Sequence, residues 1–285
     1  MKKQLFMLVS ALCVFSSCEN VLSQGNKSEE TLDGNLIVNV FQLEQTPFSS
    51  VTRTDPANVC MRLNFAVYDA DGERVKQINQ EVGDADFGSA SFQLPEDTYL
   101  LVVLAHSSNG NPTMTDPTKI KFTNAQGYTD TFLYSNEITV ESEPLELSLT
   151  LNRIVSLCRF IITDDYPEGV AKMQFQYKGG SGAFDANTGL GSVNSIQTLT
   201  FDVKSGQKQF DLYTFLHDTE GAISLVVTAL DANGNLLYEQ KFDIPLFQNQ
   251  ITWVSGDFFG DGGSQTVSPT ITIDTQWDAE NFYTY

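Results

Sequence analysis

The sequence predicts an all-β protein built from β-sandwiches. Three observations lead to this fold class. Apolar residues alternate with a period of two along most of the chain, Gly, Asn and Asp separate the short apolar runs, and no segment carries an apolar stripe of helical period over three turns. Hydrophobic residues make up 41% of the 285 residues, which is enough for a packed core. We expect about 12–15 short strands joined by turns, as in β-sandwiches.

The expected strands follow from the alternation, taken in chain order. Residues 62–68 alternate, with Leu63, Phe65 and Val67 on one face, and residues 145–151 alternate strictly. Residues 99–105 are apolar throughout, as in a central strand that is buried on both faces. The other expected strands are residues 36–41, 90–94, 154–163, 170–177, 196–203, 209–215, 222–230, 236–244, 250–254 and 270–273.

Two polar segments are expected to be loops. Residues 115–136 carry few apolar anchors, and a structureless stretch of that length is often functional or mobile. Residues 178–195 are rich in Gly, Ser and Asn. A phosphate-binding Gly-rich loop would need a helix start and a Gly-Lys-Ser/Thr ending, and this segment has neither.

Two short segments have almost the same pattern. Residues 67–75 (VYDADGERV) and 229–237 (ALDANGNLL) each place Asp-Ala-Asp/Asn-Gly between apolar runs, which is typical of a hairpin turn. The alternative is a calcium loop, but Gln80 stands where such a loop that began at Asp69 would need a glutamate. The recurrence either indicates two related domains or is coincidental.

The composition argues against several classes of function. The chain has 36 acidic and 16 basic side chains, so its formal net charge of −20 opposes nucleic-acid binding. The two histidines, His106 and His217, leave little for a catalytic triad or a metal centre, and no Gly-x-Ser-x-Gly motif is present. Acidic pairs such as Asp164–Asp165 are expected on solvated faces. We therefore predict no catalytic residues, no metal site and no cofactor.

The N-terminus predicts export and lipidation. Residues 1–17 have a basic start and a short apolar core, and they end in Ser-Ser before Cys18, like the signal peptide and lipobox of a bacterial lipoprotein. Each buried CH₂ of an acyl chain contributes about 0.8 kcal/mol, so two or three chains on Cys18 would hold durably in a membrane. The alternative is an ordinary cleaved signal. Residues 18–33 are polar and are expected to be a flexible tether.

The remaining cysteines have two interpretations. Cys13 would leave with the signal peptide, which leaves Cys60 and Cys158 in the folded part of the chain. An exported protein permits a disulfide between them. Because each lies in or beside a strand-like run, and in what we expect to be different domains, two buried thiols are the favoured interpretation.

Several motifs together resemble one family. They are L-x-L-x-R-x-V at 149–155, V-A-K-M-Q-F at 170–175, the hairpin at 229–235, I-P-L-F-Q-N-Q-I-T-W-V-S-G-D-F-F at 244–259 and T-I-T-I-D-T-Q-W-D at 270–278. With the lipoprotein signal before them, the chain resembles the fimbrillin-type pilus proteins of Bacteroidetes. The resemblance is greatest to their lipid-retained anchor subunits of the FimB/Mfa2 kind.

This resemblance implies a fold and a mode of assembly. It implies two tandem Greek-key, transthyretin-like sandwiches, which we place at residues 34–151 and 152–285. It also implies an outer-membrane lipoprotein whose partners are pilin subunits, joined to it by strand exchange. An anchor subunit would keep its first strand, whereas a shaft or tip subunit would lose it by cleavage, here after Arg53 or Arg62. Residues 270–285 would be an internal last strand or a donor strand for a neighbour.

A second class of function is a surface carbohydrate-binding lipoprotein. Sugars stack on exposed aromatic rings, and this chain has aromatic residues that would supply such a platform. They are Tyr128, Tyr134, Trp253, Trp277, Phe282, Tyr283 and Tyr285. The opposing interpretation is that Trp253 packs in a core strand and that the C-terminal aromatic residues cover a sheet edge.

Overall fold

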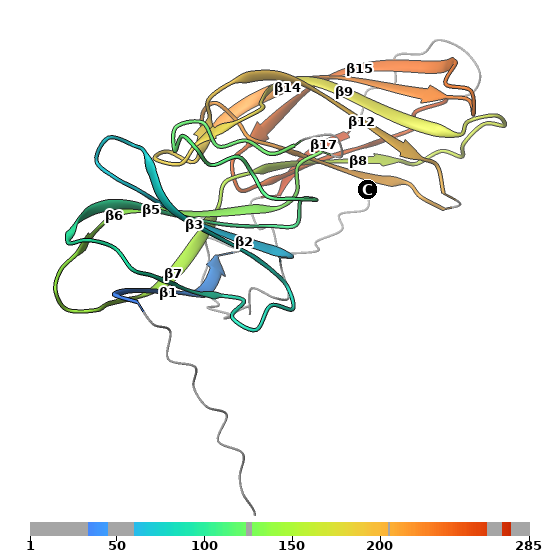
Figure 1. The fold of residues 1–285 in the computed structure, drawn as a ribbon. Helices are drawn as coiled ribbons and strands as arrows, with labels where there is room; N and C mark the ends of the chain where they lie inside the picture. The colour runs from blue at the N-terminus through green and yellow to red at the C-terminus, as the bar shows by residue number, and fades with distance from the viewer. Residues whose placement is uncertain (1–33, 45–59, 124–126, 205, 261–269, 275–285) are drawn as a thin grey trace, which may run out of the picture. The chain divides into compact units, whose positions relative to one another are not determined.

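The computed structural model describes residues 34–44, 60–123, 127–204, 206–260 and 270–274 (Figure 1). Every regular element in these ranges is a β-strand, which confirms the predicted all-β class. These residues include no helix long and apolar enough to cross a membrane. The predicted signal peptide, Cys18, the tether and Arg53 lie outside the described residues. The strands are β1 (Leu36–Glu44), β2 (Arg62–Tyr68), β3 (Arg74–Glu81), β4 (Ser89–Phe92), β5 (Asp97–His106), β6 (Thr131–Val140), β7 (Leu145–Arg153), β8 (Ser156–Ile162), β9 (Lys172–Ser181), β10 (Phe184–Asp185), β11 (Leu190–Gly191), β12 (Asn194–Asp202), β13 (Gln209–Thr214), β14 (Glu220–Leu230), β15 (Leu236–Phe247), β16 (Ile251–Gly256) and β17 (Thr270–Asp274).

The first seven strands form one sheet that closes around its own core. Their order is β3-β2-β5-β6-β7-β1-β4. Strands β6 and β7 pair only at Phe132–Arg153 and Leu133–Asn152, so the sheet turns over at this corner. Apolar side chains from both halves of the sheet meet in one cluster, which we call the first core. This arrangement is sandwich-like, because β3-β2-β5-β6 and β7-β1-β4 contribute its two sides.

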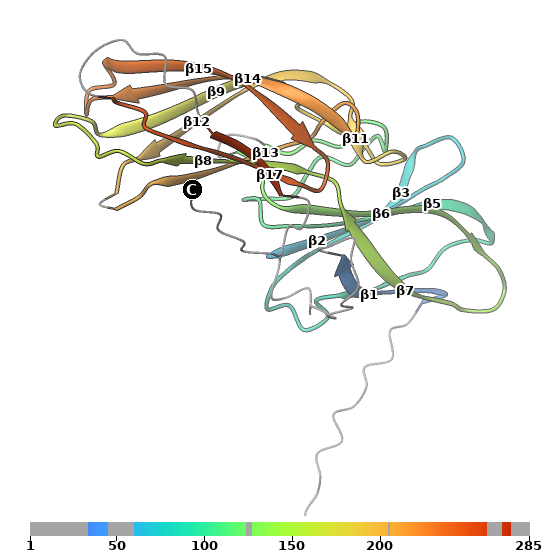
Figure 2. The same ribbon diagram turned by 180° about the vertical axis from the view of Figure 1, so that it is seen from behind.

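Later strands form two four-stranded sheets around a second core. Their orders are β12-β9-β14-β15 and β13-β8-β16-β17, and Figures 1 and 2 show the two sheets face to face. The second core takes side chains from both sheets, including Phe160 and Val254 from one, and Phe175 and Leu225 from the other. A short hairpin of β10 and β11 is inserted between β9 and β12.

The strand order of the first core recurs around the second. The third, second, fifth and sixth strands form one side of the first core (β3-β2-β5-β6), and β12-β9-β14-β15 repeat this order. On the other side, β7-β1-β4 corresponds to β16-β8-β13, with a parallel and an antiparallel pair in each. Strand β17 is an addition to the second set. The division into domains at 151/152 stays a prediction, which this repetition supports.

The two similar hairpins are confirmed. Asp69 and Asp231 begin the turns, and the Oδ1 atom of each accepts backbone N–H bonds from residues two and four positions later. Gly72 and Gly234 have φ angles of 79° and 87°, which glycine adopts without strain. One hairpin joins β2 to β3 and the other joins β14 to β15, strands that do not correspond in the repeated order. The similar turns are therefore not the trace of the repeat.

The expected loop at 115–136 is wrong at its C-terminal end, because β6 begins at Thr131. Thr131, Phe132 and Leu133 are all buried, so the start of this strand has no alternation of burial. The remainder of this segment also contributes more buried apolar side chains than its polar composition indicates. Ile120, Phe122 and Tyr128 are all buried, and they pack in a third cluster.

The second expected loop, 178–195, is also largely structured. Strand β9 continues to Ser181, and the segment then forms β10 and β11. Ile120 forms an isolated β-bridge with Phe184, so the two predicted loops pack against each other. Together they fill the third cluster, which we call the junction cluster. It joins β2 and β5 to residues that follow β7, and its members are Ala66, Tyr68, Val102, Leu104, Met114, Ile120, Phe122, Tyr128, Leu133, Ile154, Val155, Phe184, Ala186 and Phe215.

The cysteine interpretation is confirmed for both residues of the folded part. Cys60 is buried in the first core and Cys158 in the second, and neither forms a disulfide. Burial raises the pKa of the Cys158 thiol, which keeps it protonated and unreactive at neutral pH.

Candidate functional site

The candidate site is the seat of the first strand, β1. In a strand-exchanging protein, the fold is complete by itself if the chain keeps this first strand, and it needs a partner's strand if the chain loses it. Here β1 lies inside the sheet, between β7 and β4. It pairs in parallel with β7 along most of its length and antiparallel with β4 at its N-terminal half. Both hydrogen-bonding edges of that half are therefore occupied by the chain itself.

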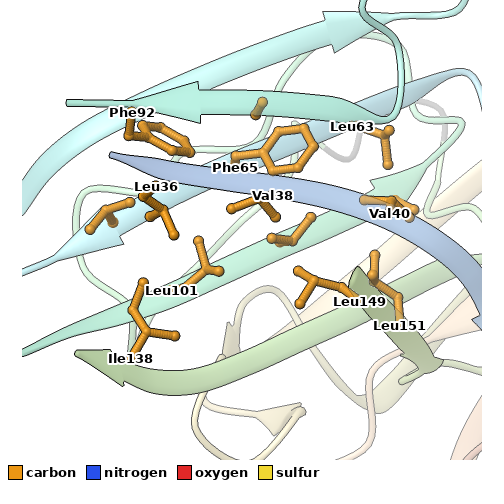
Figure 3. Packing of buried hydrophobic residues seen from close by; sticks show 14 of the residues in the cluster. Leu36, Val38, Val40, Leu63, Phe65, Phe92, Leu101, Ile138, Leu149 and Leu151 are labelled. Carbon is orange, nitrogen blue, oxygen red and sulfur yellow. The ribbon is translucent and has the colours of Figure 1, made fainter. Parts of the chain in front are cut away.

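Alternate side chains of β1 enter the first core (Figure 3). Leu36 and Val38 are completely buried and Val40 is nearly so. The period of two predicted from the sequence is therefore the period of burial. A bulge between Val40 and Gln42 shifts the register against β7, and Leu43 is again buried after it. The residues around β1 in this core include Leu63, Phe65, Phe92, Leu101, Ile138, Leu149 and Leu151.

Hydrogen bonds of Asn35 hold the N-terminal end of β1 in place. Its side-chain Nδ2 donates to the Leu94 carbonyl at 2.7 Å, and its Oδ1 accepts the Leu94 N–H at 2.9 Å. Its backbone N–H donates to Phe92 and its carbonyl accepts from Leu145, so one residue joins the strands on both sides. A Cβ on the preceding Gly34 would lie 2.2 Å from Ser91 Oγ, so the approach to β1 requires glycine.

Further polar contacts hold the outer face of β1. Ser89 Oγ donates to Asn39 Oδ1 at 2.7 Å, and Asn39 Nδ2 donates to Glu146 at 3.2 Å. The Val40 N–H donates to the Gly88 carbonyl at 2.7 Å. Sequence reasoning identified β1 but missed Asn35 and Asn39, because their partners are 50 or more residues away along the chain.

Of the two candidate processing residues, the structure places Arg62. It is the first residue of β2, whose backbone pairs with β3 on one side and β5 on the other. Its guanidinium contacts Glu81 at 2.5 Å, and its side chain is 17% exposed. A protease needs an extended, accessible backbone, so cleavage after Arg62 would require β2 to leave the sheet. Processing at either arginine stays a prediction.

The last described strand, β17, pairs with another strand of its own chain. Strand β17 pairs antiparallel with β16 from Ile251–Asp274 to Ser255–Thr270, as expected for an internal strand. Asp164 fixes the chain after β16, because its carboxylate accepts backbone N–H bonds from residues 258, 259 and 260 at 2.6–3.0 Å. Residues 275–285 lie outside the described part, and a donor role for residues 270–285 stays a prediction.

The buried histidine is bound as a structural residue. His106 Nδ1 accepts the Ser108 N–H at 3.1 Å, so its proton is assigned to Nε2, which faces Asn64 Oδ1 at 2.7 Å. Burial, with a smaller effect of Arg62, lowers the pKa of His106 to about 3. The other histidine, His217, is exposed and bonds the Gly191 carbonyl at 2.8 Å. The two histidines thus bond different neighbours.

The acidic clusters make no metal site in the described part of the chain, where no three His, Cys, Asp or Glu side chains are grouped to hold an ion. Asp164 is occupied by the backbone bonds described above. Asp165 contacts Lys208 at 3.2 Å and is solvent-exposed. These carboxylates therefore fasten loops.

Of the aromatic residues considered for carbohydrate binding, the three that the structure describes lie in different parts of the fold. Tyr128 is buried in the junction cluster, where its hydroxyl accepts a bond from Gln197. Tyr134 packs against the first core. Trp253 is half-buried on β16, with the Arg159 guanidinium 4.9 Å from its ring centre. Trp277, Phe282, Tyr283 and Tyr285 lie outside the described residues.

The fold matches solved structures of bacterial proteins. A candidate adhesin from Bacteroides ovatus aligns with a TM-score of 0.53 at 10% identity, over 84% of this chain and 94% of that chain. A candidate cell adhesion protein from the same species aligns with a TM-score of 0.50 at 13% identity, over 84% and 95%. These two alignments place the chain in the same class of all-β fold. The fimbrial anchor protein Mfa2 from Porphyromonas gingivalis also aligns, with a TM-score of 0.45 at 12% identity, over 84% and 96%.

The sequence itself gives the family. Residues 30–284 match the model of a family of unknown function, DUF6562, and the chain therefore belongs to that family. A search of curated proteins found no match.

Proposed function

We propose that this protein is a lipid-anchored subunit of a bacterial fimbria. It is held in the outer membrane through Cys18, it keeps β1 as its own first strand, and it joins pilin subunits by β-strand addition. The observation that carries the anchor role is the seat of β1. Its core-facing side chains are fully enclosed, and Asn35 links its start to β4, β7 and the turn after β4. A subunit that opens by losing this strand would expose the whole row of apolar partners around it.

Two further observations support the proposal. The fold is shared with candidate adhesion proteins of Bacteroides at TM-scores of 0.50 and above. The sequence before the fold ends its apolar run in Ser-Ser-Cys, the pattern of a lipidation signal. We propose a structural role without catalytic activity; both histidines, Asp164 and Asp165 bond neighbouring groups of the fold.

The mature N-terminus tests the anchor role. Mass spectrometry of the protein extracted from the cell surface should find a chain that begins at acylated Cys18. A chain that begins at Thr54 or Leu63 would instead make this a processed shaft or tip subunit.

Lipid anchoring is tested by substitution. Cys18→Ala should release the protein, and any fimbriae attached to it, into the medium. Cys13→Ala is the matched control, since this residue lies in the part of the chain that is removed, and it should leave both on the cell. Fimbriae that stay attached to Cys18→Ala cells would refute the anchor role. Clear retention of the purified protein on a glycan affinity gel would favour the carbohydrate-binding alternative.

A further inference from the structure

Strand β12 is an exposed sheet edge of unusual composition. It is the first strand of the sheet β12-β9-β14-β15 and pairs with β9 along its whole length. Among the described strands, none pairs with its other edge. An unpaired edge presents backbone N–H and C=O groups that can template another strand, and proteins commonly protect such edges with charges, proline or short length.

The other described edges carry such protection. Strand β15 has Glu239, Lys241, Asp243 and Pro245, and β3 has two basic residues and a terminal glutamate. Strands β4 and β17 are only four and five residues long. Strand β13, the edge beside β8, carries the charged Asp211, which pairs with Arg159. By contrast, residues 194–201 of β12 (NSIQTLTF) contain no charge, no proline and no glycine. They are rich in Ile, Thr, Leu and Phe, which favour strands.

The outer face beside this edge is also apolar and open. Ile196 is 65% exposed, the highest value among the exposed large hydrophobic side chains of the described residues. It lines an open hollow of about 480 Å³ together with Lys178, Ser195 and Ser224. Lys178 is the charged member of this lining and lies opposite Ile196 in the register with β9. The hollow therefore favours a partner that brings apolar contact and a negative charge.

We propose that β12 pairs antiparallel with β12 of a second copy of this chain, around a two-fold axis at Thr198. In that register Thr198 lies opposite Thr198, Ile196 opposite Thr200, and Asn194 opposite Asp202. No like charges face each other, although the chain carries a net charge of −20. Asp202 of the second copy lies opposite the Asn194 amide, on the face of the sheet that carries Lys178. The proposal does not depend on the proposed fimbrial role.

The self-complementarity of this register singles out a second copy as the occupant. Threonine and isoleucine side chains pair well across strands, and an Asn amide can donate to an Asp carboxylate. At the other edge of this sheet, β15 presents Glu239, Lys241 and Asp243 on its outer face. A strand that paired there would need charges that match these three. A neutral edge on an acidic protein is where two copies can approach with least repulsion.

A single cysteine at the axis tests the pairing. In the full-length chain in intact cells, Thr198→Cys should cross-link to twice the monomer mass under mild oxidation, because residues directly opposite have Cβ atoms roughly 4.5–5.5 Å apart. Thr200→Cys is the matched control. Each threonine accepts one bond from a glutamine of β9, at 3.3 Å for Thr198 and 3.1 Å for Thr200. Two Thr200→Cys residues would be displaced by four residues along the strand, about 13 Å, and should stay monomeric.

A charge variant tests the same pairing without cross-linking. Thr198→Lys places two ammonium groups opposite each other, and it should convert a sedimenting dimer into a monomer while the unfolding curve stays close to that of the unchanged protein. The proposal is overturned if Thr198→Cys stays monomeric, if both cysteine variants cross-link equally, or if the Thr198→Cys product has the mass of a different partner.

Discussion

Single polar residues fasten strands that are distant in the sequence. Asn35 joins the start of β1 to Leu94, and Asn64 connects β2 to His106, Asn79 and Asn111. Such amides stabilise the fold because they satisfy buried groups, and a buried group left unpaired costs about 1–3 kcal/mol. Predictions at this scale therefore concern the loss of one partner.

Asn35→Ala should lower the free energy of unfolding by about 1–3 kcal/mol, since both the N–H and the carbonyl of Leu94 lose their partner. Urea denaturation measures the effect. Thr98→Ala, which removes an exposed contact on β5, is the control and should change stability by no more than about 0.5 kcal/mol. Equal effects of the two substitutions would show that the Asn35 side chain does not fasten β1.

His106 should make the protein less stable in acid. Its pKa is about 3 in the folded chain against 6.5 for the free side chain, so the unfolded state binds the proton first. The stabilisation by neutral His106 is complete above about pH 6.5 and is lost as the pH falls towards 3, by up to about 1.4 kcal/mol per pH unit.

Denaturant unfolding of His106→Gln at pH 7, 6, 5 and 4 measures this contribution. Carboxylates titrate in the same range, so the relevant quantity is the difference between the variant and the unchanged protein. The variant should show a shallower loss of stability in acid, whereas Thr98→Ala, which removes an exposed contact and no titratable group, should keep the original slope. A variant with an unchanged slope would contradict the prediction.

Residue-level details of this kind could not be read from the sequence. Asn35 and Asn64 look like ordinary polar residues beside or within a strand, and their partners stand 59 and 15–47 residues away. In β1 the pattern identifies which residues face the core, because burial follows the period of two there. It does not identify which polar side chain crosses to another strand.

At the scale of elements, β1 combines a buried row of side chains with two paired edges. Leu36→Ala should destabilise the protein by about 2–5 kcal/mol, because it empties volume in the first core. The neighbouring Ile37→Ala is the control. Ile37 is half-buried on the other face and should cost clearly less. Similar losses for the two in urea denaturation would mean that β1 is not seated through its core-facing side.

Strand prediction succeeded where alternation was strong and failed where packing came from distant segments. Residues 62–68 form β2 with the predicted bounds, because Leu63, Phe65 and Val67 alternate on one face. The polar composition of residues 115–136 predicts a loop, because Ile120, Phe122 and Tyr128 are spaced irregularly. Their burial depends on Phe184 and Phe215, whose proximity no local pattern can reveal.

At the scale of the whole described chain, the junction cluster couples the two cores. Phe215 stacks on Phe184 at 4.9 Å between ring centres and on Phe122 at 6.1 Å, so one ring touches both predicted loops. The unchanged protein should therefore unfold in one calorimetric transition. Phe215→Ala should cost about 3–5 kcal/mol and separate the melting into two transitions.

The calorimetric control is a residue of similar size within one core. Phe210→Ala empties volume in the second core only. It should lower the stability of that core without loosening the junction cluster. A single transition in Phe215→Ala that merely shifts to lower temperature would show that the coupling does not depend on this ring.

The parallel pairing of β1 with β7 has a mechanical consequence. The described chain enters through the N-terminal end of β1 and leaves the first core through the C-terminal end of β7, and these two strands are direct neighbours that run the same way. Tension between those two points loads their hydrogen bonds in shear, all at once, rather than peeling them apart one by one. The pair β8–β16 has the same geometry around the second core. If the protein is tethered at its N-terminus and pulled from the other end of the fold, the force therefore acts along the two parallel pairs, β1–β7 and β8–β16. These pairs give the strongest mechanical resistance.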